Sequence, residues 1–482
     1  MAYSLSATTR LPWGSLLPAI FLGVSAALLA PWLDWRAATA LLALLLLAGG
    51  AAWVLATPQR WWFSFSAATL LLPPLPLDFG NTGPHVAVVF AAMGLAGGLL
   101  RLSQWRFPAT SIAAALTLFL SVLLLSVLTA FFYFGLSVAA ATLARVLLFG
   151  IAAYAFFDLS CGPAARETDP VAFARRLYFL GLGAALIALL DFYFQWPALG
   201  GFAEQFVWLP GRIVRRAQGF FYDAGMLGNL CAFFLVMIVL AALRPEVGRR
   251  LFSRNLLCAG GLVFSAALLF SYSRASLLNL VAALAAVVFL HRELLLPHWR
   301  RAKAVVFGVL GGLALVLLSA PAFAESYLHR VLGTAFWFFH DPRALLAGRF
   351  QAWQSLLDFL AAHPWHLLFG VGFKTLPYTT VAGRPLIADN MYLSMLVETG
   401  VVGLLALLLL NAVILVSAYR ASRGGTVAGF FGALMFCFWI GQLFQMLLID
   451  TLTYWRVLPL YFAVLALAVR EVDQAPETGP HP

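Results

Sequence analysis

Apolar runs of about 16–25 residues recur from one end of the chain to the other, and polar links separate them. Each run can cross about 25–30 Å of hydrocarbon at about 1.5 Å per helical residue. The pattern predicts an all-α, polytopic integral membrane protein with about 12–14 transmembrane helices, folded as one membrane domain over residues 1–482. The expected spans are 15–31, 37–56, 62–78, 85–100, 110–132, 136–158, 176–196, 223–242, 256–271, 276–291, 303–322, 390–417, 426–446 and 454–470.

One long polar and aromatic stretch, residues 323–389, interrupts the pattern and predicts a large loop outside the membrane. Within it, residues 343–361 carry apolar positions at helical spacing, with polar positions on the other face. This predicts an amphipathic helix that lies on the membrane or caps the bundle. The apolar positions are Leu346, Phe350, Trp353, Leu357 and Leu360.

Composition agrees with the pattern, because 63% of the residues are hydrophobic and only 10% are charged. Soluble domains have roughly 45–50% apolar and 25% charged residues. The four cysteines lie in or beside apolar runs without a CxxC spacing, which indicates small buried hydrophobic residues rather than disulfides or a metal site. No nucleic-acid partner is expected, whereas membrane lipids are.

Basic residues decide the expected orientation, since the net charge is +11 and most arginines in short links fall on one side of the membrane. Both termini are then cytoplasmic, and the polar segment 471–482 is expected to be a disordered cytoplasmic tail. Two segments on the opposite face, 197–222 and 323–389, nevertheless carry several basic residues. The outer face is therefore expected to bind an anion.

Three polar groups meet on that face if the predicted topology holds: an arginine cluster before the eighth span, Arg274 between the ninth and tenth spans, and Asp389 with Asn390 at the start of the twelfth. Arginines beside a carboxylate suit an anionic substrate and a general base. Each group also has a structural alternative. The arginines can bind lipid headgroups or extend to the interface, and Asp389 can cap its helix.

Two further acidic residues are expected to be structural. Glu398 is expected to be a hydrogen-bonded or ion-paired acid within its span, and Asp191 to pair with Arg145. The histidines at 340, 363 and 366 form no HxxxH pair, and the chain has no DxD, Walker or GxGxxG motif. Neither a catalytic metal nor another cofactor is expected.

At these residues the sequence resembles the O-antigen polymerase/ligase family of bacterial membrane glycosyltransferases, mainly over residues 205–420. The matching pieces are Arg216 to Gly219, Ser273-Arg274-Ala275, Gly348-Arg349 followed by Trp353, the turn from His363-Pro364 to Gly370-Val371-Gly372, and Asn390, Tyr392, Leu393, Glu398, Gly400 and Gly403.

The resemblance implies a GT-C-type, metal-independent, inverting glycosyltransferase of the bacterial inner membrane, with its active site facing the periplasm. The donor would be a glycan on undecaprenyl diphosphate and the acceptor another glycan, with a chain-length regulator as a possible partner. Asp389, Arg274 and Arg216 are the expected catalytic residues. The expected substrate-binding residues are Arg212, Arg215, Arg349, Asn390, Tyr392 and Tyr222.

Asp389-Asn390 departs from the His-Asn that is typical of the ligase branch, and this favours a polymerase of O-antigen or exopolysaccharide repeat units. An O-antigen ligase or a protein O-oligosaccharyltransferase remains the alternative, because these enzymes share the donor. A flippase or another transporter of lipid-linked oligosaccharides is the alternative from a different class. Its binding residues would lie near the middle of the membrane rather than at one face.

Overall fold

The computed structural model describes residues 35–75, 84–106, 110–196, 205–209, 212–292, 311, 349–381 and 383–470. The chain forms two compact units, 1–64 and 65–482, which are described separately. The first contains α2 (Trp35–Leu55) and the start of α3 (Pro58–Leu71). The expectation of one membrane domain across the whole chain stays a prediction.

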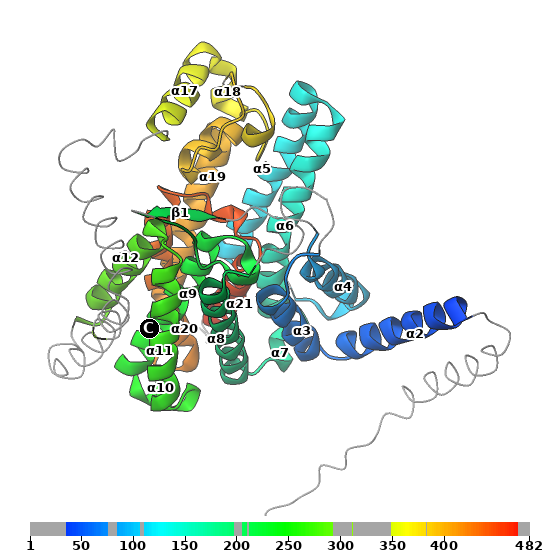
Figure 1. The fold of residues 1–482 in the computed structure, drawn as a ribbon, viewed down its shortest axis with the longest axis vertical. Helices are drawn as coiled ribbons and strands as arrows, with labels where there is room; N and C mark the ends of the chain where they lie inside the picture. Colours follow the sequence, from blue (N-terminus) through cyan, green and yellow to red (C-terminus); the bar gives the residue numbers. More distant parts are fainter. Residues whose placement is uncertain are drawn as a thin grey trace, which may run out of the picture. The chain divides into compact units, whose positions relative to one another are not determined.

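The second unit is almost entirely helical, which confirms the all-α polytopic class (Figure 1). Its longer helices are α4 (Val86–Leu100), α5 (Ser111–Phe134), α6 (Leu136–Ser160), α8 (Pro170–Phe194), α9 (Ala224–Leu243), α11 (Arg254–Phe270), α12 (Arg274–Leu290), α17 (Arg349–Ala362), α19 (Met391–Ser422), α20 (Val427–Met446) and α21 (Leu458–Val469). The shorter ones are α7 (Ala164–Glu167), α10 (Pro245–Leu251) and α18 (Pro364–Phe369).

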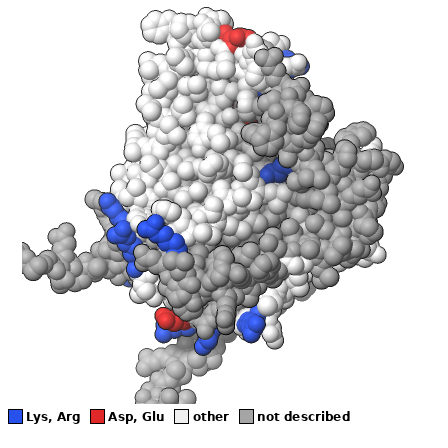
Figure 2. Space-filling view, turned by 90° about the vertical axis from the view of Figure 1, so that its left-hand side faces the viewer, with Lys and Arg blue, Asp and Glu red and all other residues white. Residues whose placement is uncertain are grey.

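Helices α9, α20 and α21 form the centre of this unit, because their side chains are buried almost along their whole lengths. Helices α12 and α19 pack on α20, α6 packs on α21, and α5 packs on both α6 and α19. Leucines remain exposed on the outer helices, as expected for surfaces that face lipid. On the face drawn in Figure 2, most of the described surface likewise carries no charged side chain.

A buried amide cluster joins α9, α12, α20 and α21. The Nδ2 atoms of Asn229 and Asn279 both donate to the Oε1 atoms of Gln442 and Gln445, at 2.6–3.0 Å. The Tyr461 hydroxyl donates to Asn229 Oδ1 at 2.7 Å. Hydrogen bonds of this kind hold helices together in a membrane, where association gains little from the hydrophobic effect.

Helix α19 is broken rather than continuous. Gly400 has φ 71° and ψ −172°, so the 32-residue element is two helices that meet at this residue. A straight helix of that length would measure about 48 Å, well beyond a hydrocarbon core of about 30 Å. The part after Gly400 is long enough to span, at about 33 Å. The part before it begins beside Asp389, and its Tyr392 contacts the same end of α20 that Asn411 contacts from the part after the break.

The described helices agree with the expected spans in position but are fewer. Six are long and apolar enough to cross a membrane, or up to eight if each bent pair is one span, and three shorter apolar helices accompany them. The expected spans 15–31 and 303–322 lie outside the described residues, apart from residue 311. The expected third span ends early, at Leu71, because prolines at 73 and 74 follow.

Two features of the outer segments differ from expectation. An antiparallel hairpin, β1 (Phe206–Leu209) with β2 (Arg212–Arg215), lies in a segment for which no strand was expected. The amphipathic helix exists as α17, but its buried face is Ala352, Leu356 and Leu360, of which only Leu360 belongs to the predicted stripe. Loop residues 323–348 lie outside the described residues, and these include the expected helix start and Leu346. The tail 471–482 lies outside them as well.

The buried face of α17 differs because this helix packs on protein and not only on lipid. Its three buried residues join a cluster with Leu376, Leu386, Ala388 and Val397. Phe350 and Leu357, two members of the predicted stripe, stay exposed. The helix therefore has two apolar faces, the predicted stripe and the face that is buried. Periodicity alone could not show which of these faces packs on the rest of the protein.

Candidate functional site

The arginine cluster and the Arg274 link are brought together by direct contacts. Arg216 follows the hairpin, and its Nε donates to the Ser271 carbonyl oxygen at 2.7 Å. The next residue, Ala217, donates from its backbone N–H to the Phe270 carbonyl at 2.9 Å. Arg274 is the exposed first residue of α12, three positions beyond Ser271. Arg216 therefore contacts the turn that carries Arg274, the residue with which it is expected to act.

The amino-terminal ends of α9 and α12 lie beside each other under these arginines. Ser276 Oγ donates to the Gly225 carbonyl at 3.2 Å, and a Cβ added at Gly228 would lie 2.7 Å from Ser276 Oγ. Each helix start carries partial positive charge from its aligned peptide dipoles. Two helix starts and two arginines therefore make this region electropositive, as an anion site requires.

Asp389 precedes α19 in a left-handed conformation, with φ 46°. Its Oδ2 accepts from Arg349 Nε at 3.0 Å, and both side chains are about one third exposed. Trp353 donates from its indole N–H to the Ala388 carbonyl, so α17 holds both residues that precede Asn390. Arg349 is thus placed to orient the Asp389 carboxylate.

Asn390, not Asp389, caps α19. Its Oδ1 accepts from the Leu393 backbone N–H at 3.0 Å. The structural alternative for Asp389 is therefore wrong, because the neighbouring amide takes the capping position. Asn390 in turn has a structural task at the site, whether or not it also touches a substrate.

Asp223 is the site residue that sequence reasoning missed. It caps α9 through hydrogen bonds from Gly225 N at 2.7 Å and Met226 N at 3.2 Å. Burial raises the pKa of Asp223; the cap bonds and Arg216 oppose this, whereas Asp389 adds to it. Arg216 and Asp389 thus both lie within electrostatic reach of one carboxylate. An aspartate directly before an apolar run was the available sequence signal.

Three expected substrate-binding residues are buried or make contacts within the protein. Arg215 is buried and donates to Asp191 Oδ1 at 2.6 Å, so its guanidinium is directed into the protein. Tyr222 is buried as well. The Tyr392 hydroxyl donates to the Leu443 carbonyl at 3.2 Å, which ties α19 to α20. The side chain of Arg212 lies outside what is described.

The expected pair between Arg145 and Asp191 does not form, because Asp191 is bound to Arg215 instead. Arg145 donates to the Lys374 carbonyl at 3.3 Å and lies 4.1 Å from the Tyr378 ring centroid. The hairpin that carries Arg215, whose fold was not foreseen, brings a nearer cation to Asp191.

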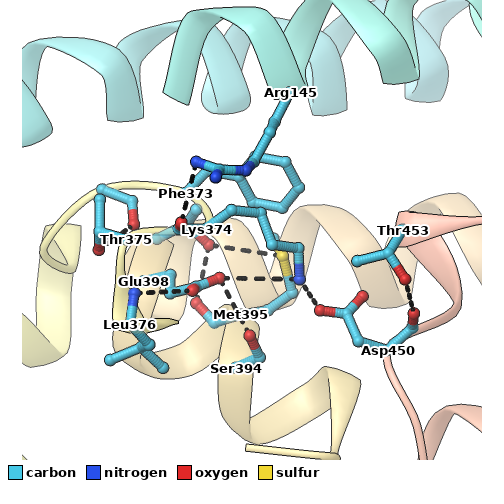
Figure 3. A network of polar contacts seen from close by, with 12 residues as sticks. Arg145, Phe373, Lys374, Thr375, Leu376, Ser394, Met395, Glu398, Asp450 and Thr453 are labelled. Carbon is cyan, nitrogen blue, oxygen red and sulfur yellow. Dashed lines mark hydrogen bonds and ion pairs between the residues drawn. The ribbon is translucent and has the colours of Figure 1, made fainter. Parts of the chain in front are cut away.

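Glu398 is a buried acid that has both a hydrogen-bonding partner and a nearby cation, so both alternatives considered from the sequence are present (Figure 3). Lys374 Nζ lies 3.9 Å from Glu398 Oε2 and contacts the Asp450 carboxylate, while Ser394 Oγ donates to Glu398 Oε2 at 3.0 Å. Burial lowers the pKa of Lys374 to about 8, with Glu398 acting in the opposite direction. The network fastens the loop after α18 to α19 and to the link before α21.

No group of three metal-ligating side chains occurs within the described residues. His363 and His366 stack instead on Phe359, with ring centroids 4.9 and 5.3 Å away. His340 is outside the described residues.

Residues 259–408 match the family model described as O-antigen ligase. The matched segment contains Arg274, Arg349, Asp389 and Asn390, whereas Arg216 and Asp223 precede it. A comparison with curated proteins gave no match. The family match therefore covers the parts of the candidate site from α11 to α19.

Proposed function

We propose that this member of the O-antigen polymerase/ligase family polymerises undecaprenyl-diphosphate-linked oligosaccharide repeat units into O-antigen or exopolysaccharide. The family is one of glycosyl-transferring, multi-pass bacterial membrane proteins that act on lipid-linked glycans. The proposal goes further, since it places the protein in the inner membrane with the reaction on its periplasmic face. The contact between Arg216 and the turn that bears Arg274 carries it.

The diphosphate of the donor is assigned to Arg216, Arg274 and the starts of α9 and α12. Guanidinium groups form paired hydrogen bonds with phosphate oxygens, and helix starts add favourable dipoles. As the bond between the anomeric carbon and the diphosphate oxygen breaks, negative charge grows on the leaving group. Groups placed beforehand at that oxygen stabilise the transition state, which is the role a metal ion has in other transferases.

Asp389 is assigned as the general base. Its carboxylate takes the proton of the acceptor hydroxyl while the hydroxyl oxygen attacks the anomeric carbon, and the diphosphate leaves with its bonding electron pair. Attack opposite the leaving group inverts the anomeric centre. Arg349 holds Oδ2 at 3.0 Å and thereby fixes the direction of the carboxylate.

The choice of a polymerase rests on Asp389, since the resemblance places a histidine there in the ligase branch. A ligase or a protein O-oligosaccharyltransferase would use the same donor site with another acceptor. A transporter is less well supported, because the two arginines assigned to the diphosphate lie at the start of α12 or contact the turn before it, rather than halfway along a helix.

The test is elongation of defined lipid-linked repeat units by the purified full chain, with the products separated by length. Asp389→Asn and Arg274→Lys should each abolish polymer, while Asp358→Asn, an exposed change on α17, should leave it unchanged. Chelation of divalent metal should not slow the reaction. Normal product ladders from both site variants, or strict dependence on Mg²⁺, contradict the assignment. Transfer to lipid A-core alone would identify a ligase.

A further inference from the structure

Helix α18 presents an apolar surface that the rest of the described chain leaves uncovered. None of its six residues is buried. Trp365 is 81% exposed and Phe369 58%, and the two leucines between them are exposed as well. The helix carries no Asp, Glu, Lys or Arg. Its exposed side chains therefore offer a surface suited to lipid rather than to water or to a charged partner.

The end of α5 fixes the level of α18 relative to the membrane. The His366 ring lies 4.6 Å from the Tyr133 ring, centroid to centroid, and Tyr133 is in the last turn of α5. A single residue, Gly135, connects α5 to α6. Because both helices are long enough to span, so short a turn has to lie near a membrane surface. The exposed Tyr133 itself suits an interfacial aromatic belt.

The break in α19 gives the same level independently. The loop after α18 binds the backbone of α19 there, with Val371 N donating to Val397 O at 3.2 Å and Gly372 N to Glu398 O at 2.7 Å. A Cβ added at Gly400 would lie 2.1 Å from the Leu368 carbonyl oxygen. The spanning part of α19 starts at this break. Two separate helices thus place α18 where hydrocarbon ends and headgroups begin.

We propose that α18 is an interfacial helix embedded in the lipid leaflet on the side of Asp389, with Trp365 and Phe369 in contact with the acyl boundary. The occupant of this surface is the bilayer itself. Since α18 is uncharged, it needs no anionic headgroup. The preceding helix, α17, begins with Arg349, so the anchor also fixes the ion pair at Asp389 relative to the membrane surface.

The test uses the full chain in bilayers of phosphatidylethanolamine and phosphatidylglycerol, with the exposed Cys258 replaced by serine. A nitroxide is placed at Trp365→Cys, at Phe132→Cys as a reference near the end of α5, and at Gln354→Cys on the polar face of α17 as a control. Collision rates are measured with oxygen, which concentrates in lipid, and with a water-soluble nickel complex.

At position 365 oxygen collisions should exceed nickel collisions, as at position 132, whereas nickel should dominate at position 354. Dominant nickel collisions at 365 would show a surface in water, and low rates with both reagents would show one covered by protein. Either result overturns the proposal. If Trp365→Cys does not fold, the same collision rates are measured with the nitroxide at Phe369→Cys. The measurement requires no turnover and is independent of the proposed reaction.

Discussion

Two adjacent residues divide the tasks at the start of α19. Asn390 satisfies the helix end, and this leaves the Asp389 carboxylate for Arg349 and for chemistry. Had the aspartate been the cap, backbone N–H groups would occupy its oxygens. The sequence Asp-Asn therefore separates a structural residue from a candidate catalytic one.

Arg349→Lys is expected to lower the turnover rate about tenfold or more with little change in donor KM, because an ammonium does not hold a carboxylate in one direction as the guanidinium does. The measurement is steady-state elongation of lipid-linked repeat units. Arg384→Lys, an exposed change in the same outer segment, is the matched control and should behave as the parent. An unchanged turnover number in Arg349→Lys would remove Arg349 from the site.

Arg215→Met is expected to destabilise the protein by about 3–5 kcal/mol, because it leaves Asp191 as a buried carboxylate without its cation. Thermal unfolding in detergent measures the loss. Adding Asp191→Asn removes that charge, keeps an acceptor for the Gly219 N–H, and should restore much of the stability and of the activity. A stable Arg215→Met protein with impaired donor binding would instead indicate contact with substrate.

The sequence allowed better predictions of which residues belong to the candidate site than of which residues they contact. Arg216 and Arg274 could be predicted to meet because topology places them on one face. Asp223 was missed, since its coupling to Arg216 and Asp389 arises from the fold and not from spacing. The ion pair of Arg215 with Asp191 could not be predicted, because the two residues are 24 positions apart and no periodicity revealed the hairpin that carries Arg215. Arg215 was therefore assigned to the substrate.

Among the elements, the contact between α18 and the break in α19 depends on two glycines with positive φ. Gly370 has φ 71° and would place a Cβ 2.3 Å from the Glu398 carbonyl carbon. Gly400 is equally constrained from the opposite side. Side chains at either position would separate the two elements.

Gly400→Ala is therefore expected to cost about 1–3 kcal/mol and to loosen α18 from α19. Thermal unfolding together with proteolysis of the loop after α18 measures both effects. Gly261→Ala is the control, because a Cβ there would meet nothing within 4 Å inside α11. If the two alanine variants melt alike, the break does not depend on the glycine.

Stability should also depend on pH through His366. Partial burial lowers the pKa of His366 below its usual value of 6.5; the hydrogen bond with the Gly370 backbone opposes this, and His363 adds to it. The unfolded chain therefore binds the proton more readily, so the contribution of this residue is complete above pH 6.5 and is lost as the pH falls below it. Unfolding temperatures between pH 5 and 8 test this. His366→Phe should reduce the slope, and an identical slope would exclude His366 as its source.

Some spans could be predicted closely because lipid imposes one simple pattern, as α20 at Val427–Met446 shows for the expected 426–446, whereas α3 ends at Leu71 and not at the expected 78. The break in α19 could not be foreseen, since Gly400 sits in an otherwise continuous apolar run. Its conformation is set by a loop that approaches from 30 residues earlier. The fold class thus follows from composition and period, whereas the kinks follow from tertiary contact.

For the whole molecule, orientation is the property that links the proposed chemistry to the cell. A cysteine at Asp358, on α17, should react with an impermeant maleimide added to intact spheroplasts. A cysteine at Glu246, exposed on α10 at the far end of α9, should react only after lysis. Both variants carry Cys258→Ser. The reverse pattern would place the candidate site in the cytoplasm and contradict the use of a periplasmic donor.

The broken α19 has a last consequence, which concerns hydrophobic matching. Its spanning part measures about 33 Å, and α18 meets it at one end of that length. A thicker bilayer would draw the break into hydrocarbon, and a thinner one would lift α18 out of the interface. The ion pair of Arg349 and Asp389 joins the start of α17 to the start of α19, the helices that adjoin α18 and the break. Acyl-chain length should therefore tune the rate, with an optimum near the thickness of the native membrane.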